Sequence, residues 1–143
     1  MESDTVKLLR ECNAGIKMGE DAIRQVLPMA SDEGLRKTLE TVKGTHSSLG
    51  DRTHELLLRI GADTKEPHAV IRMMSSMKIK AKMMMSPTDS SIADLMTDGC
   101  DMGIKSLYRN LNKYKDAATE AKDIAKRLIA SEEYLENQIR GYL

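Results

Sequence analysis

Residues 32–60 read DEGLRKTLETVKGTHSSLGDRTHELLLRI, and this stretch decides the fold. Its apolar positions recur at alternating steps of four and three, which places them on one face of an α-helix. The seam consists of Leu35, Leu39, Val42, His46, Leu49, Thr53, Leu56 and Ile60. Gly61 follows directly and is typical of a helix C-terminus. The sequence therefore predicts a long helix from about Asp32 to Ile60 with one unbroken buried face.

A second amphipathic stretch precedes this helix, from about Asp4 to Met29. Its apolar positions are Leu9, Cys12, Ile16, Ile23, Val26 and Leu27. Pro28 should kink or end it, and Ser31 should cap the helix that follows. Because the connection is short, the two helices are expected to be antiparallel neighbours.

The C-terminal half repeats this layout with a helix from Thr88 or Asp89 to about Ala117, and another from about Thr119 to Tyr142. The inward positions expected in the first of these are Thr97, Asp101, Ile104, Leu107, Tyr108, Leu111 and Tyr114. Those expected in the second are Ala121, Ile124, Leu128, Ser131, Leu135, Ile139 and Tyr142. Four helices of about 25 residues are each about 38 Å long, which is the size of a helical bundle.

A shorter helix is predicted between the two halves, after a linker at Ala62–Pro67. It runs from His68 to about Met85 and contains six methionines and four basic residues. Ile71, Met74, Met77, Ala81 and Met84 form one stripe along it. This segment is expected to cross from one helical pair to the other.

Composition supports an all-α chain of one domain spanning residues 1–143. There is no Trp or Phe, and the residue usage favours helix. Lys plus Arg equals Asp plus Glu at 22 each, so no net charge attracts nucleic acid or an anionic membrane. We expect a cytoplasmic protein, because no apolar stretch has the length of a signal or a membrane span. Cys12 and Cys100 are expected to be reduced and buried, with a disulfide between them as the alternative.

Three ionisable residues, Glu20, His46 and Asp101, fall on the inward stripes, where a bundle core would ordinarily carry Leu or Ile. Residues 20–27 and 101–108 can also be laid over each other, which puts an acid at the same depth in the first and third long helices. The sequence thus predicts that two carboxylates and an imidazole meet inside the bundle.

This arrangement resembles the ferritin-like superfamily, and more narrowly its small bacterial four-helix-bundle domains of unknown function. The resemblance covers nearly the whole chain. It implies two antiparallel helical hairpins joined by a crossover that contains a short Met-rich helix. Metal-binding members of that superfamily use one Glu from each of two helices and a Glu-x-x-His pair from each of the other two.

Compared with that pattern, the di-metal site is degenerate. Glu20, Asp101 and His46 match ligands, but Lys43 stands where a Glu is required. Ser131 and Tyr134 stand where the last Glu and His would be, unless a shift of one residue turns Glu132 or Glu133 inward. Three alternatives follow for Glu20, His46 and Asp101. They form a metal-free polar cluster with Lys43, Ser131 and Tyr134, or a reduced Zn, Fe or Mn site with redox or hydrolytic chemistry. In the third alternative, one or more of them faces solvent because the helical phase differs by one residue from the assigned one.

The methionines of the crossover have three interpretations, which are core packing, a protein interface and a Cu(I) site. The leading functional hypothesis is a non-catalytic bundle that acts through protein–protein contacts. It would form a homodimer, with Met73, Met74, Met77 and Met84 as the candidate contact residues. Binding to a membrane is disfavoured because the basic residues lack an aromatic anchor.

Overall fold

The computed structural model describes residues 3–63 and 69–143, with side chains of the third helix described from residue 76 onward. These residues form five α-helices and no strand, so the all-α prediction is confirmed for the described chain. The helices are α1 (Asp4–Val26), α2 (Glu33–Arg59), α3 (Ala69–Met85), α4 (Asp89–Lys113) and α5 (Thr119–Ile139). Single 3₁₀ turns, η1 (Leu27–Met29) and η2 (Arg140–Tyr142), follow α1 and α5. The predicted helix start at His68 and most of the linker before it lie outside the described residues.

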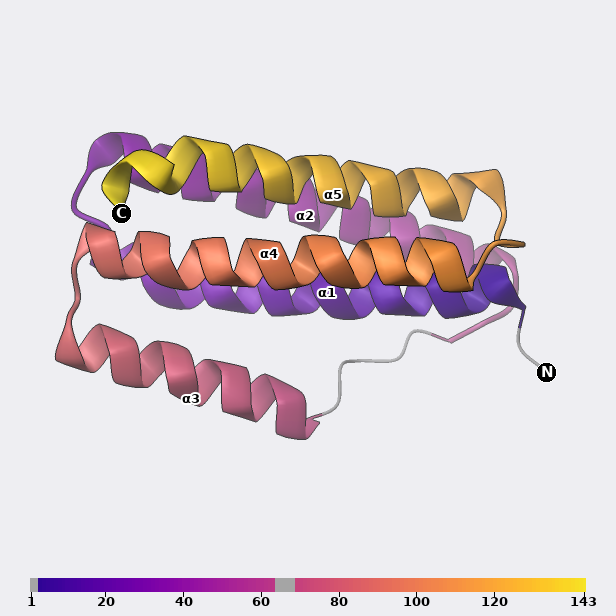
Figure 1. The fold of residues 1–143 in the computed structure, drawn as a ribbon. Coiled ribbons are helices and arrows are strands. Elements are labelled where there is room, and N and C mark those ends of the chain that lie inside the picture. The colour runs from indigo at the N-terminus through magenta and orange to yellow at the C-terminus, as the bar shows by residue number, and fades with distance from the viewer. Residues whose placement is uncertain (1–2, 64–68) are drawn as a thin grey trace.

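The four long helices lie side by side, and α3 packs outside them against α1 and α4 (Figure 1). Each short connection reverses the chain direction, so α1 and α2 are antiparallel, as are α4 and α5. The antiparallel neighbours predicted from the short connection after Pro28 are therefore present. None of the helices in the described ranges has the length and apolar content needed to cross a lipid bilayer.

Buried apolar side chains form two clusters at different heights along the helices. The first lies toward the N-terminus of α1 and contains Leu8, Leu9, Cys12, Ile16, Leu49, Leu56, Leu57, Leu107, Ala117, Ala121, Ile124, Ala125, Leu128 and Ile129. The second contains Ile23, Val26, Ala30, Leu35, Leu39, Val42, Met83, Ile92, Met96, Cys100, Leu135 and Ile139. Between the two clusters, α1 contributes Gly19 and Glu20, α2 contributes His46, and α5 contributes Glu132. The core is thus divided by a polar layer.

Side chains fix the helix ends. Asp32 caps α2 by accepting a hydrogen bond from the Leu35 amide at 3.0 Å, so the predicted cap at Ser31 is wrong by one residue. The backbone amides of Ser31 and Asp32 instead donate to the Asp89 carboxylate at 2.8 and 3.0 Å, which ties the start of α2 to the start of α4. Tyr142 donates its hydroxyl proton to Asp32, and this bond comes first among the causes that lower the pKa of Asp32.

Three predicted helices end earlier than expected, and one of them, α5, ends at Ile139 and continues to the predicted Tyr142 as the 3₁₀ turn η2. α1 ends at Val26 because Pro28, which lacks an amide proton, forces the last turn into the 3₁₀ form. α4 ends at Lys113, four residues before the predicted Ala117. Asp4 and Thr5 of α1 accept hydrogen bonds from the amides of residues 116 and 118, so these amides are satisfied outside a helix. At the end of α2, Gly61 has φ +74°, as its predicted role as a helix stop requires.

The inward face of α4 differs from the predicted one. Its buried apolar residues include Ile92, Met96 and Cys100, whereas Asp101 is exposed and Tyr108 is 51% exposed. The predicted stripe was extended backward from Ile104 through Asp101 and Thr97. The residues that pack in the core are one position earlier, at Cys100 and Met96. Leu107 is buried, and Ile104, Leu111 and Tyr114 are partly buried against the first cluster, so this part of the stripe is confirmed and its extension through Asp101 is wrong.

The adjacent residues Leu57 and Leu58 test this core. Leu57 is fully buried and Leu58 is 71% exposed on the same turn of α2. We expect Leu57→Ala to lower the free energy of unfolding by about 2–5 kcal/mol, because it removes packed methyl groups and leaves a cavity. The matched Leu58→Ala variant should change it by less than about 0.5 kcal/mol. Urea denaturation of both variants makes the measurement, and equal losses would contradict the assigned helix phase.

Candidate functional site

His46 is the centre of the polar layer. Its side chain is 1% exposed, between the buried seam residues Val42 and Leu49 of α2. Nδ1 lies 3.0 Å from the carbonyl oxygen of Val42, one turn earlier, and so donates a proton to it. Nε2 lies 2.9 Å from Oε1 of Glu132 in α5. Both ring nitrogens are therefore engaged by the protein, and the predicted burial of His46 is confirmed.

Glu132 is the partner that the sequence only suggested as an alternative. Ser131 occupies the inward position, as predicted, and is 8% exposed. Glu132 stands beside it, and its longer side chain reaches into the layer while remaining 14% exposed. Gly103 of α4 faces this carboxylate, since a Cβ at that position would lie 3.6 Å from Oε2. Tyr134, which was expected in the cluster, is 45% exposed.

The charge of this pair favours protonated histidine. Burial is the largest single influence on the pKa of His46 and acts to lower it. The hydrogen bond and the negative charge of Glu132, the Val42 carbonyl and the charge of Glu20 act in the opposite direction. Together they raise the pKa of His46 above its ordinary value of 6.5. At pH values below the raised pKa of His46, the pair is an imidazolium and a carboxylate that link α2 to α5.

Glycine at position 19 makes room for the imidazole. A Cβ on Gly19 would lie 2.8 Å from Nε2 of His46, closer than carbon and nitrogen can approach without contact strain. Glu20, the next residue, is half-buried and close enough for its charge to act on the ring. Lys43, a predicted cluster member, is half-buried on α2. Among the described residues, the groups that accept hydrogen bonds from the His46 ring are the Val42 carbonyl and the Glu132 carboxylate.

The two cysteines lie in different apolar clusters. Both are free and buried. Burial, with a smaller effect from Glu11, raises the pKa of Cys12 to about 12. Burial also raises the pKa of Cys100, as do the charge of Glu132 and its hydrogen bond to the thiol. These protonated thiols act as small apolar groups rather than as nucleophiles.

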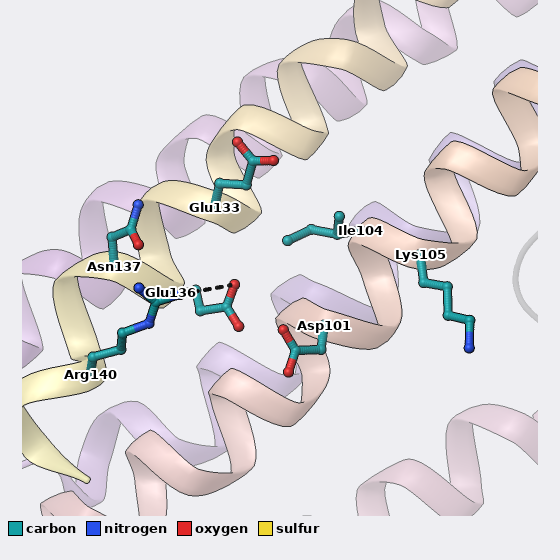
Figure 2. Close-up of a pocket in the computed structure, with 7 residues that line it drawn as sticks. All are labelled: Asp101, Ile104, Lys105, Glu133, Glu136, Asn137 and Arg140. Carbon is teal, nitrogen blue, oxygen red and sulfur yellow. Dashed lines mark ion pairs between the residues drawn. The ribbon is translucent and has the colours of Figure 1, made fainter.

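Asp101 does not join His46, although the sequence predicted that it would. Figure 2 shows it pointing from α4 toward Glu136 of α5 across a cavity of about 460 Å³. Its hydrogen bond to Glu136 raises the pKa of Glu136, and burial and the charge of Asp101 add to this shift. Arg140 lies 4.0 Å from the other side of Glu136. We call this cavity the α4–α5 groove; its lining residues are Asp101, Ile104, Lys105, Glu133, Glu136, Asn137 and Arg140.

The three residues predicted as metal ligands do not meet. Glu20 and His46 lie in the polar layer, and Asp101 lines the α4–α5 groove. Over residues 3–63 and 69–143, no three His, Cys, Asp or Glu side chains are grouped so that they could hold a metal ion. Buried side-chain polar atoms in the same ranges all have hydrogen-bond partners. Binding of Zn, Fe or Mn stays a prediction.

The crossover helix turns its predicted stripe toward solvent. Met77 is 64% exposed and Met84 is 86% exposed, and Ala81 between them is exposed as well. The face that packs inward carries Met83, which is 5% exposed, and Ile79. The side chains of Ile71, Met73 and Met74 lie outside the described residues. The prediction that the methionines pack in the core is therefore wrong for the described stripe residues Met77 and Met84.

Comparison with known proteins supplies a fold but no activity. No family model matches the chain, and no curated protein matches it. Among solved structures, a DUF305 fragment from Deinococcus radiodurans superposes with a TM-score of 0.76, over 98% of this chain and 95% of that chain. The sequence identity is 13%, so the likeness concerns the fold alone. The chain is a helical domain whose fold is similar to that of the DUF305 fragment.

The contact between Gly19 and His46 yields a test with an internal control. In a helix, Gly→Ala ordinarily stabilises by about 0.5–1 kcal/mol. Gly15→Ala should show this gain, because nothing lies within 4 Å of its new Cβ. Gly19→Ala should instead lower the free energy of unfolding by about 1–3 kcal/mol, because the imidazole must move. Thermal and urea denaturation measure both, and a gain in stability at position 19 would contradict the placement of His46.

The His46–Glu132 pair should make stability depend on pH. Because the pKa of His46 is raised on folding, its contribution is complete below pH 6.5 and is lost as pH rises through the raised pKa. We therefore expect wild-type stability to fall across that window, and Glu132→Gln to lack this fall. Glu133→Gln, which alters an exposed carboxylate on the same helix, should keep it. Urea denaturation at successive pH values gives the profiles, and identical profiles for wild type and Glu132→Gln would refute the pairing.

Proposed function

We propose that this chain is a non-catalytic, ferritin-like four-helix bundle that acts through protein–protein contact and forms a homodimer through the outer face of α3. The observation that carries the proposal is the exposure of Met77, Met84 and Met85 at 64%, 86% and 88%. They recur on one helix face together with Ala81. Contiguous exposed apolar surface on a helix is characteristic of an interaction site, and methionine is enriched at protein interfaces.

The interior supports a structural role for the ionisable residues. His46 is 1% exposed, and both of its ring nitrogens are bound within the protein. A substrate would have to displace either the Val42 carbonyl or the Glu132 carboxylate to reach it. Breaking a buried charge pair costs about 3–5 kcal/mol, because the remaining charge is left without a partner. The polar layer is therefore better suited to holding α2 and α5 in register than to catalysis.

The attachment of α3 also suits an interface element. Met83 anchors it in the second apolar cluster, Ser76 donates a hydrogen bond to Gln25 at 3.2 Å, and Lys82 pairs with Asp94 at 3.2 Å. These contacts fix one face of α3 on α1 and α4. The opposite face is left for a second protein, and a fixed helix loses little conformational entropy when it binds.

Solution mass tests the proposal. Size-exclusion chromatography with light scattering should give a mass near twice the 16.0 kDa of the chain. Met77→Glu with Met84→Glu should give the single-chain mass, because two charges would have to be buried at the contact. Leu58→Glu, at an equally exposed leucine on α2, serves as the matched control and should stay dimeric. A wild-type protein that remains at 16 kDa at high concentration would overturn the homodimer.

A further inference from the structure

Charge is distributed unevenly over a chain whose formal charge is zero. The sequence of α3 carries four basic residues and no acidic one. Lys78 and Lys80 are exposed and flank the Met77–Met84 ridge. Lys82 is already paired with Asp94 of the same chain. The outer face of α3 is thus an apolar ridge with positive edges.

The neighbouring surface has the opposite charge. From Asp89 to Met102, α4 carries four Asp and no basic residue. The α4–α5 groove adds Glu136 from α5, which faces Asp101, and Glu133, whose side chain points away from Asp101 in Figure 2. Lys105 lines the groove but points away from the two facing carboxyls in Figure 2. The groove thus carries three carboxyl groups, with Arg140 paired to Glu136 and Lys105 turned away, so its charge is more acidic than basic.

The groove also offers apolar contact surface. Ile104 points between α4 and α5 in Figure 2, and Met102 on the adjoining turn of α4 is 71% exposed. An apolar ridge with cationic edges matches a groove with an apolar floor and anionic edges. Complementary charge of this kind selects partners and fixes register.

We propose that α3 of one copy docks in the α4–α5 groove of a second copy, with Lys78 and Lys80 opposite Asp101 and Glu133, and that the same contact is repeated by symmetry. The inference rests on the homodimer proposed above and names the surface that receives α3. Each copy contributes one helix and one groove, which is what a two-fold dimer requires of a single chain.

The carboxyl groups that face each other in the groove of one copy suit a lysine from a second copy. Asp101 and Glu136 hydrogen-bond each other, and this contact raises the pKa of Glu136. Two carboxyl groups held together favour a shared proton, and Arg140, 4.0 Å from Glu136, offsets this only in part, since the pKa of Glu136 is still raised. A lysine ammonium stabilises both groups as carboxylates and takes over the role of that proton. A dimer of ordinary size buries about 800 Å² per partner, or roughly 400 Å² for each helix and each groove.

Charge reversal in trans tests the contact. One double variant is Lys78→Glu with Lys80→Glu, and the other is Asp101→Lys with Glu133→Lys. Each alone should raise the dimer Kd roughly tenfold or more, because both symmetric contacts then oppose like charges. When the two variants are mixed, a heterodimer has complementary charges at both contacts and should form with near wild-type affinity. Native mass spectrometry distinguishes the heterodimer from the homodimers by mass.

A control and a milder variant complete the design. Glu40→Lys with Asp51→Lys reverses two exposed charges on α2 and should leave the wild-type Kd unchanged. If circular dichroism shows that a reversal variant is unfolded, Asp101→Asn with Glu133→Gln replaces it and should weaken the dimer. A dimer that Met77→Glu with Met84→Glu disrupts, but that neither reversal affects and mixing does not restore, overturns this contact and leaves the homodimer standing. A monomeric wild type overturns both.

Discussion

The hydrogen-bonded ion pair between His46 and Glu132 is the constraint on which the arrangement of the long helices depends. It joins α2 to α5 at the height where the two apolar clusters separate. The pair needs space beside it on α1, because a Cβ at Gly19 would lie 2.8 Å from Nε2 of His46, whereas a Cβ at Gly103 of α4 would make an ordinary contact with Glu132 at 3.6 Å. A buried polar contact of this kind is costly to misalign, so it fixes the register of helices whose apolar faces alone would tolerate sliding.

This layer also holds the ionisable side chains of His46 and Glu132 against each other inside the molecule. The imidazole is enclosed and satisfied by protein groups, and the carboxylate beside it is only 14% exposed. Asp101 lies on the outer side of α4 with Glu136. Surface properties are concentrated elsewhere, in the methionine ridge of α3 and the acidic groove between α4 and α5. Buried contacts set the helix geometry, and the exposed ridge and groove are the surfaces through which we propose that two copies bind.

Much of the fold could be predicted from periodicity because burial imposes it. The seam of α2 holds from Leu35 to Leu56, and it correctly placed His46 inside. The inward line of α4 was harder, since Gly99 and Gly103 carry no side chain and Asp101, Thr97 and Ile104 offered a competing pattern. Glu132 was obscured by Ser131, a residue that sits inward but is too short to reach His46. Only the positions of the other helices show that Glu132, and not Ser131, reaches His46.

The crossover helix marks another limit of the sequence. A stripe at Met77, Ala81 and Met84 predicts one apolar face, but it does not say whether that face meets the core or solvent. Ile79 and Met83 form a second apolar face on the same helix, and packing against α1 and α4 selected it. A helix with two apolar faces can be oriented only by tertiary contacts. The same ambiguity makes its exposed face informative about function.

The most direct test of the central claim is a double-mutant cycle on His46→Gln and Glu132→Gln, with unfolding free energies measured below pH 6.5, where the ion pair is fully formed. If the two side chains interact as an enclosed ion pair, the losses of the two single variants should add up to more than the loss of the double variant. The difference, which is the coupling energy, should be about 1–3 kcal/mol. Strictly additive losses would show that the two residues do not interact and would contradict the account.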